Sequence, residues 1–349
     1  MPLDFDPDGA ADSDAGVFGL PFSEEQAALV LVPVPWEATT SYGGGTSTGP
    51  AAILAASGQI DLYDDQVVDP WRSGIHMRAE SPRLRSMNKA GKAAAQKIIR
   101  AGGIADTPAL KKALAEANRL GGELNTRVRA ECAGLMAAGK IVGVVGGDHS
   151  VPYGAFQAAA AAYGSFGLLH FDAHSDTRDA YEGFSWSHAS IMRNALRDIP
   201  RISRIVQVGI RDYCRQEADY VAGLGARAKV FHGRELSRGR FAGKAFDATA
   251  KEVVDALPEK VWVTFDIDGL DPKLCPHTGT PVPGGLEFDE ADRLLGLVAR
   301  SGRTILGFDL VEVAPAPGGK DEWDANVGMR LLFRLCAWTL RSRGLAKDR

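Results

Sequence analysis

The chain has 349 residues, of which 45% are hydrophobic and 24% are charged, a composition typical of a globular protein rather than a disordered one. A formal net charge of −4 gives no electrostatic basis for binding nucleic acid. Because no apolar run reaches the roughly 18 residues of a membrane span, and no secretory signal pattern is seen, we expect a cytoplasmic protein that binds no membrane.

The cysteines are few and far apart in the sequence. They are Cys132, Cys214, Cys275 and Cys336, with no Cys-x-x-Cys pair. This usage fits a reducing compartment and argues against a zinc site built from thiolates.

The sequence divides into an N-terminal arm, a single domain and an insertion within that domain. Residues 1–26 are rich in Asp, Gly and Pro, which predicts an N-terminal arm that is mobile or lies on a neighbouring subunit. Residues 27–349 show no linker or internal repeat, so we expect a single domain. Within it, residues 66–130 are interpreted as a peripheral insertion, with helices at about 88–100 and from Thr107 onward, where a capping residue precedes a proline.

Short continuous apolar runs along the chain predict buried strands, and helical stretches fall between them. The predicted strands are 28–34, 141–145, 166–171, 204–209, 261–265 and 304–308. The predicted helices begin at about 51 and then span about 152–162, 188–197, 215–223, 246–256, 288–301 and 324–342. Such alternation predicts a three-layer α/β/α fold with a mainly parallel sheet of about eight strands.

Polar residues follow four of these apolar runs, each at the end of a predicted strand. They are His149, then Asp172, His174 and Asp176, then Asp266 and Asp268, and finally Glu312. Because the carboxyl ends of parallel strands share one edge of a sheet, we expect these side chains to meet.

The predicted cluster has the composition of a metal site. Four aspartates in one crevice cannot all stay ionised without cations, and two divalent ions would balance them. Carboxylates with imidazoles suit Mn(II) and tolerate Ni(II). In the alternative interpretation some of these aspartates cap helices, which would explain one or two of them.

Three segments resemble the signatures of the ureohydrolase family, which includes arginases and agmatinases. They are Gly-Gly-Asp-His-Ser at 146–150, Asp-Ala-His-Ser-Asp at 172–176 and Phe-Asp-Ile-Asp-Gly-Leu-Asp-Pro at 265–272. The resemblance covers about 28–65 and 140–340. The loop around 178–190 is most similar to that of the agmatinase branch.

The resemblance implies a role for each site residue. Two metals would be bridged by Asp172 and Asp266, with His149 and Asp176 completing one site and His174 and Asp268 the other. The guanidinium would be held by Glu312, and protons would move through Asp176 and His188. The substrate-binding residues would be Arg178, Asp179, Glu182 and Glu312. The implied reaction converts agmatine to putrescine and urea, with two Mn(II) ions or, alternatively, Ni(II).

The substrate and the assembly each leave an alternative open. Since residues 66–130 are longer than expected and His277 stands where a small residue is typical, the alternative is a nickel-dependent hydrolase of guanidine, guanidinobutyrate or a biguanide. Against it, Asp179 and Glu182 outnumber Arg178, which favours an ammonium tail. Family analogy implies a homo-oligomer, a trimer or hexamer, and a hetero-oligomer with a paralogue is the alternative.

Other classes fit the sequence less well. A deacetylase on the related fold uses a single zinc ion and would not need His149 and Asp176, and a non-catalytic binding subunit would not keep all six ligands. The remaining histidines, His76, His170 and His232, are expected to be structural, with His170 turned away from the face that carries Asp172.

Overall fold

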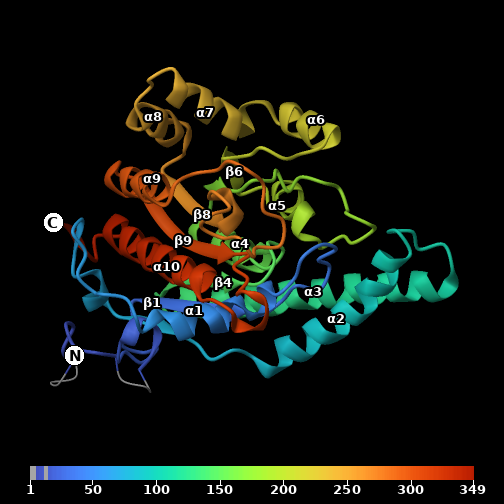
Figure 1. Cartoon of the computed structure of the whole chain (residues 1–349), viewed down its shortest axis with the longest axis horizontal. Coiled ribbons are helices and arrows are strands. Elements are labelled where there is room, and N and C mark those ends of the chain that lie inside the picture. The colour runs from blue at the N-terminus through green and yellow to red at the C-terminus, as the bar shows by residue number, and fades with distance from the viewer. Residues whose placement is uncertain (1–4, 12–14) are drawn as a thin grey trace.

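The computed structural model describes residues 5–11 and 15–349. Eight strands form a central sheet in the order β3-β1-β4-β9-β8-β5-β6-β7, and every neighbouring pair is parallel (Figure 1). The strands are β1 (Leu29–Val34), β3 (Ile75–Met77), β4 (Ile141–Gly146), β5 (Phe166–Phe171), β6 (Ile202–Val208), β7 (Ala228–Phe231), β8 (Lys260–Asp266) and β9 (Thr304–Val311). The predicted fold class is confirmed.

Helices cover both faces of this sheet. They are α1 (Gly49–Ser57), α2 (Pro82–Arg100), α3 (Pro108–Ala137), α4 (Tyr153–Tyr163), α5 (Ile191–Asp198), α6 (Arg215–Gly223), α7 (Gly233–Phe241), α8 (Phe246–Ala256), α9 (Phe288–Arg300) and α10 (Trp323–Ser342). One hydrophobic core joins α1, α8, α9 and α10 to one face, and a second joins α3, α4 and α5 to the other. Strand β1 supplies both cores, with Leu29 and Leu31 in the first and Val30 and Val32 in the second.

The apolar runs located the inner strands and most helices, but not the edges. Strand β3 has only three residues and includes His76, and in β7 only Phe231 is buried, so neither is a continuous apolar run. Helix α7 contains no fully buried residue and therefore lacks an apolar stripe. A small antiparallel pair, β2 (Val67–Val68) with β10 (Lys347–Asp348), was also not predicted.

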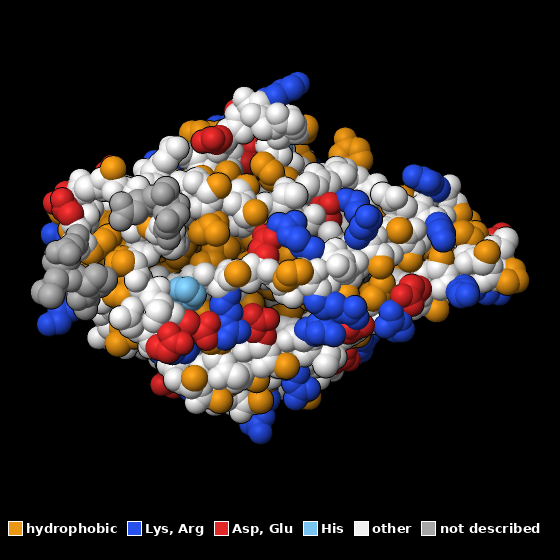
Figure 2. All heavy atoms as spheres, turned by 90° about the horizontal axis from the view of Figure 1, so that it is seen from below, with side chains coloured by type: hydrophobic (Ala, Val, Ile, Leu, Met, Phe, Trp, Pro, Cys, Tyr) orange, Lys and Arg blue, Asp and Glu red, His pale blue; other side chains and the backbone are white. Residues whose placement is uncertain are grey.

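The segment predicted as a peripheral insertion supplies edge strand β3, which belongs to the central sheet, and most of a long helical hairpin, α2 and α3, that projects from one end of the molecule (Figure 1). Thr107 caps α3 as predicted, its hydroxyl accepting the Leu110 N–H at 3.2 Å. The second half of α3 is not peripheral, because Leu124 and Val128 are buried in the core that covers β4. On the face shown in Figure 2, acidic and basic side chains are interspersed.

Part of the expected N-terminal arm packs on its own chain, since Val17, Phe18 and Leu20 are buried in the core beside β1. Residues 1–4 and 12–14 of that arm lie outside the described residues. The division into an arm, one domain and an insertion stays a prediction. Among the described residues, none of the helices has the length and apolar character needed to cross a membrane.

Candidate metal centre and active site

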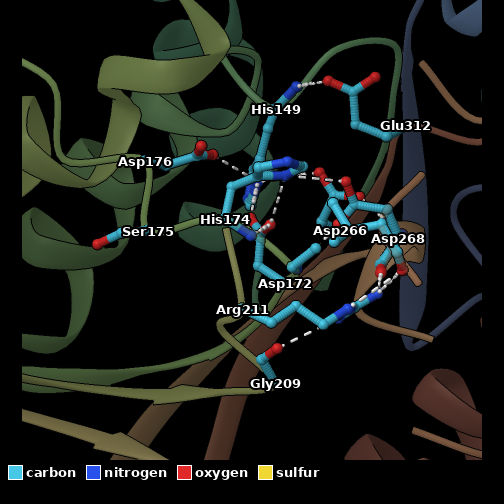
Figure 3. A network of polar contacts seen from close by, with 12 residues as sticks. His149, Asp172, His174, Ser175, Asp176, Gly209, Arg211, Asp266, Asp268 and Glu312 are labelled. Atoms are coloured by element: carbon cyan, nitrogen blue, oxygen red, sulfur yellow. Dashed lines mark hydrogen bonds and ion pairs between the residues drawn. The ribbon is translucent and has the colours of Figure 1, made fainter. Parts of the chain in front are cut away.

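The predicted polar residues do meet at one edge of the sheet. They follow β4, β9, β8 and β5, which are neighbours in the strand order, so their carboxyl ends open onto one crevice. Figure 3 shows the side chains converging there: His149, Asp172, His174, Asp176, Asp266, Asp268 and Glu312.

The side chains form two groups that share Asp172. In the first group, His149 Nδ1 lies 3.0 Å from Asp172 Oδ2, 3.1 Å from Asp176 Oδ2 and 3.4 Å from Asp266 Oδ2. In the second, His174 Nδ1 lies 3.0 Å from Asp268 Oδ2 and 3.4 Å from Asp172 Oδ1. Each oxygen of Asp172 thus faces a different group, as a bridging carboxylate would.

The electrostatics of this cluster call for cations. Among the described residues, no lysine or arginine side chain bonds to its aspartates; Arg211 donates instead to backbone carbonyls, including that of Asp268 at 2.7 Å. Burial, reinforced by the charge of Asp172, raises the pKa of Asp176 to about 7. Burial and the neighbouring Asp268 raise the pKa of Asp266 well above its usual range. The carboxylates and imidazoles therefore fit two hard or borderline divalent ions.

His170 is a correction to the sequence-based expectation. Its Nε2 lies 2.7 Å from Asp172 Oδ2, and its ring packs edge-on against His149 with centroids 5.2 Å apart. Period-two alternation places residues 170 and 172 on the same side of the strand, so this contact could have been foreseen. His170 offers a ligand atom within 4.8 Å of those of His149, Asp172 and Asp176.

Two further residues orient His149 and were missed. Thr264 Oγ1 lies 2.9 Å from His149 Nε2 and donates to Asp309 Oδ1 at 2.8 Å. Trp262 fixes the other Asp309 oxygen through an N–H···O bond of 2.7 Å. Because Thr264 then accepts from Nε2–H, the Nδ1 atom of His149 is left free to face the carboxylates. The sequence feature that could have predicted these hydrogen bonds is the presence of two polar residues, Thr264 and Asp309, inside otherwise apolar strands.

Glu312 lies at the rim of the cluster in a fixed conformation. Its Oε1 accepts the His149 N–H at 2.9 Å, and its own N–H donates to Gly147 O at 2.8 Å. Its φ of 62° is unusual for a residue with a side chain and costs about 1–3 kcal/mol, as strained residues at functional sites often do. Burial and the nearby Asp148 raise the pKa of Glu312 well above its usual range.

The segment 177–188 holds the other predicted residues, and their side chains lie in different surroundings. Asp179 points to solvent, with 71% of its side chain exposed, and pairs with Arg193 at 3.2 Å. The Arg178 guanidinium lies over the Tyr181 ring and 3.7 Å from Glu217. Neither side chain therefore contacts the metal cluster.

Glu182 and His188 each carry a buried polar atom without a hydrogen-bond partner among the described residues: Glu182 Oε2 and His188 Nδ1. Burial raises the pKa of Glu182. Burial, with the neighbouring His174, lowers the pKa of His188 to about 4, so at pH 7 this imidazole is neutral in the metal-free protein. That value lies below the near-neutral one on which its proton-shuttle role was expected.

Two loops border the site near Glu312. His277 is held by Asp324, with Nδ1 2.7 Å from Oδ2 and its N–H donated to Oδ1 at 3.0 Å. Gly43 packs so closely on Gly279 that a Cβ there would lie 2.6 Å from the Gly279 oxygen, and its φ is +68°. The loop that contains Gly43, Gly44 and Gly45 therefore lies against the loop that carries His277 and Gly279.

The sequence matches known proteins over most of its length. A model described as the arginase family matches residues 27–337. The N(1)-aminopropylagmatine ureohydrolase of Thermus thermophilus is 32% identical over 293 residues, covering 83% of this chain and 84% of that protein. The agmatinase of Klebsiella pneumoniae is 30% identical and covers 84% of this chain and 81% of its own length.

Solved structures show the same fold. The proclavaminate amidino hydrolase of Streptomyces clavuligerus superposes with a TM-score of 0.72 at 24% identity, covering 96% of this chain and 99% of that one. Because the family model spans most of the sequence and curated ureohydrolases match it over more than four fifths of their length, the chain belongs to the arginase family and is a ureohydrolase, an enzyme that hydrolyses a C–N bond of guanidino compounds.

Proposed function

We propose that this enzyme hydrolyses a guanidino compound whose tail carries an ammonium group, with agmatine as the first candidate and urea and putrescine as products. The observation that carries the proposal is the buried carboxylate oxygen of Glu182, in the loop that follows Asp176, which has no hydrogen-bond partner among the described residues. A cation placed there would favour the charged form of Glu182 and regain its desolvation cost.

The basic residue of the same loop is occupied elsewhere. Arg178 lies over Tyr181 and near Glu217, so a carboxylate tail would have to displace these contacts to reach it. A buried carboxylate near Glu182 would also be repelled. This argues against arginine and 4-guanidinobutyrate. We expected Asp179 to bind the substrate ammonium together with Glu182. Asp179 is less suited to this role because its carboxylate is paired with Arg193.

Glu312 would bind the guanidinium end of the substrate. Its Oε1 is held by the His149 N–H, and its backbone is fixed by Gly147 and by the Thr278 hydroxyl, which donates to Glu312 O at 2.8 Å. A carboxylate already fixed in this way needs little ordering to accept a charge-assisted hydrogen bond from a guanidinium N–H.

We propose that the metals are two Mn(II) ions, with Ni(II) as the alternative. Asp172 and Asp266 would bridge them, and the remaining ligands would be His149, His174, Asp176 and Asp268. When bound, such ions lower the pKa of water toward neutrality and act as Lewis acids. Residues of the chain would then transfer protons: Asp176 at the cluster, and His188, whose Nδ1 has no partner among the described residues, on the route to solvent.

A nickel-dependent hydrolase of guanidine or a biguanide is the second candidate, and one contact favours it. The turn between α2 and α3 packs against the segment 177–188, because a Cβ on Gly103 would lie only 3.0 Å from Glu182 Cγ. A pocket mouth narrowed by this hairpin would suit a small substrate.

The assembly and location are also proposals. We propose a cytoplasmic homo-oligomer, a trimer or hexamer, with a hetero-oligomer formed with a paralogue as the alternative. The location is supported by the four cysteines, all of which are free thiols.

A panel of substrates tests the proposal. Urea release should be measured for agmatine, arginine, 4-guanidinobutyrate, guanidine and a biguanide, with the protein loaded with Mn(II) or Ni(II). The proposal expects the highest kcat/KM for agmatine. Higher kcat/KM for arginine would overturn the charge argument, and activity confined to guanidine and biguanide would favour the second candidate.

A further inference from the structure

A hollow of about 260 Å³ lies beside the metal-binding segment, between α6 and strands β6 and β7. Its lining includes Ser175, Gln207, Tyr213, Glu217, Val221 and His232. Ser175 comes from the segment that supplies Asp172, His174 and Asp176 to the metal cluster, so one stretch of chain borders both sites. The volume is slightly below the roughly 300–1,000 Å³ of pockets for drug-sized ligands, which suits a smaller molecule.

Gln207 lines the hollow, and one of its hydrogen-bond acceptors has no partner among the described residues. Its amide nitrogen lies 3.0 Å from His170 Nδ1 and donates to Ser175 O at 2.9 Å. Both partners are acceptors, since His170 uses its Nε2–H toward Asp172, and this fixes which end of the amide is nitrogen. The amide oxygen of Gln207 is therefore left over, fully buried and without a partner among the described residues.

The remaining lining defines the chemistry of a ligand. Glu217 adds a carboxylate that is only 4% exposed. The lining contains the His232 imidazole but no lysine or arginine, and the Arg178 guanidinium lies 3.7 Å from Glu217. An anion would be repelled by Glu217 and Gln207 Oε1, whereas an N–H donor with positive charge would satisfy Gln207 Oε1 and be attracted by the Glu217 carboxylate. The two oxygens of Glu217 already accept the N–H groups of Thr177 and Cys214. Apolar side chains, including Ile210, Val221 and Val230, complete the wall and suit a short hydrocarbon tail.

We propose that this hollow is a second ligand site, specific for a small primary alkylammonium ion. The ammonium donates to Gln207 Oε1 and faces Glu217, while the alkyl chain packs on α6. The site is independent of which guanidino compound the enzyme hydrolyses.

The polar wall of the hollow also supports the metal-binding segment. Gln207 holds the carbonyl of Ser175, and Glu217 Oε1 accepts the Thr177 N–H at 3.1 Å. These two contacts flank Asp176 on either side. A ligand that binds the same side chains therefore changes turnover without competing with the guanidino substrate.

The experiment uses the metal-loaded full chain and n-butylammonium chloride, with n-butanol as the neutral analogue. A crystal soaked with n-butylammonium should show its nitrogen at hydrogen-bond distance from Gln207 Oε1. Calorimetry should give at least tenfold weaker binding of n-butanol. Ordered water alone at Gln207 Oε1 in the soaked crystal, or equal binding of the amine and the alcohol, would overturn the proposal.

Variants separate this hollow from the active site, where an amine product also binds. Ala218→Leu fills the hollow from α6 and should weaken n-butylammonium binding at least tenfold; Val221→Phe is a second filling variant. Ala226→Leu, the same change at an exposed position outside the hollow, should have no effect. In the unmodified enzyme, n-butylammonium should inhibit urea release even at saturating substrate. This inhibition should disappear in the two filled variants, and the same inhibition in those variants would contradict the proposal.

A final comparison identifies the source of the ligand. The amine that the enzyme itself releases is compared with n-butylammonium in the same calorimetric assay. Tighter binding of the released amine would make the hollow a product sensor, and tighter binding of n-butylammonium would point to an external amine. Both results agree with an ammonium site, whereas binding of neither amine in the hollow would refute it.

Discussion

Two adjacent glycines in α3 provide a sharp test of how the helical hairpin supports the active-site loop. A Cβ at Gly121 would lie 2.8 Å from Trp186 Cβ, whereas at Gly122 the nearest Trp186 atom is Nε1 at 3.6 Å. Trp186 also packs on Tyr153, with ring centroids 4.9 Å apart, and precedes His188 by two residues. The same substitution, glycine to alanine, is therefore expected to have opposite effects at neighbouring positions.

The magnitudes follow from these distances. Carbon atoms in contact prefer about 3.5–4.0 Å, so the Gly121→Ala side chain must displace Trp186 by about 1 Å. Overpacking of this kind costs about 1–3 kcal/mol, and the better helix propensity of alanine returns about 0.5–1 kcal/mol. We expect Gly121→Ala to lower the free energy of unfolding by about 0.5–2 kcal/mol and Gly122→Ala to raise it by up to about 1 kcal/mol.

The kcat for urea release should also be lower in Gly121→Ala than in Gly122→Ala. A misplacement of about 1 Å can cost about 10²-fold in rate, and because only part of the Trp186 shift reaches His188, we expect kcat of Gly121→Ala to fall about tenfold. The assay combines urea unfolding with steady-state urea release on metal-loaded protein, and Gly122→Ala is the matched control. Equal stability and equal kcat in the two variants would refute the close contact between Gly121 and Trp186.

Three further predictions concern the site itself. Asp172→Asn should abolish binding of both metals because Asp172 belongs to both ligand groups, whereas His149→Ala should weaken one site, as elemental analysis can show. His188→Ala should lower kcat by about 10²–10⁴-fold with metal content unchanged, and loss of metal would make His188 structural instead. Glu182→Gln should lower kcat/KM about tenfold for agmatine but not for guanidine, because a charge-assisted hydrogen bond becomes a neutral one. Asp179→Asn, at an exposed and paired position, is its control, and a matching loss there would disprove the role of Glu182.

The inner sheet and the metal cluster could be predicted for one physical reason. Strands buried on both faces appear as continuous apolar runs, and parallel strands end at one edge. Residues such as Asp172 and Asp266, placed just beyond those runs, therefore had to converge. The edge strands β3 and β7 were not predicted from the sequence because only part of each is buried.

The support around the cluster depends on contacts between strands, whose pairing the isolated polar residues do not specify. Thr264 and Asp309 belong to different strands, and their bond to each other and to His149 exists only because β8 and β9 pair in the observed register. Asp179 likewise looked like a substrate residue from its loop alone, and only the fold brings Arg193 beside it.

The central claim, that two metal ions serve one guanidino-hydrolysing site, is tested most directly by titrating Mn(II) into metal-free protein while urea release from agmatine is followed. The shared position of Asp172 between the two ligand groups predicts that activity rises until two ions are bound per chain. Full activity reached with one tightly bound ion per chain would contradict it.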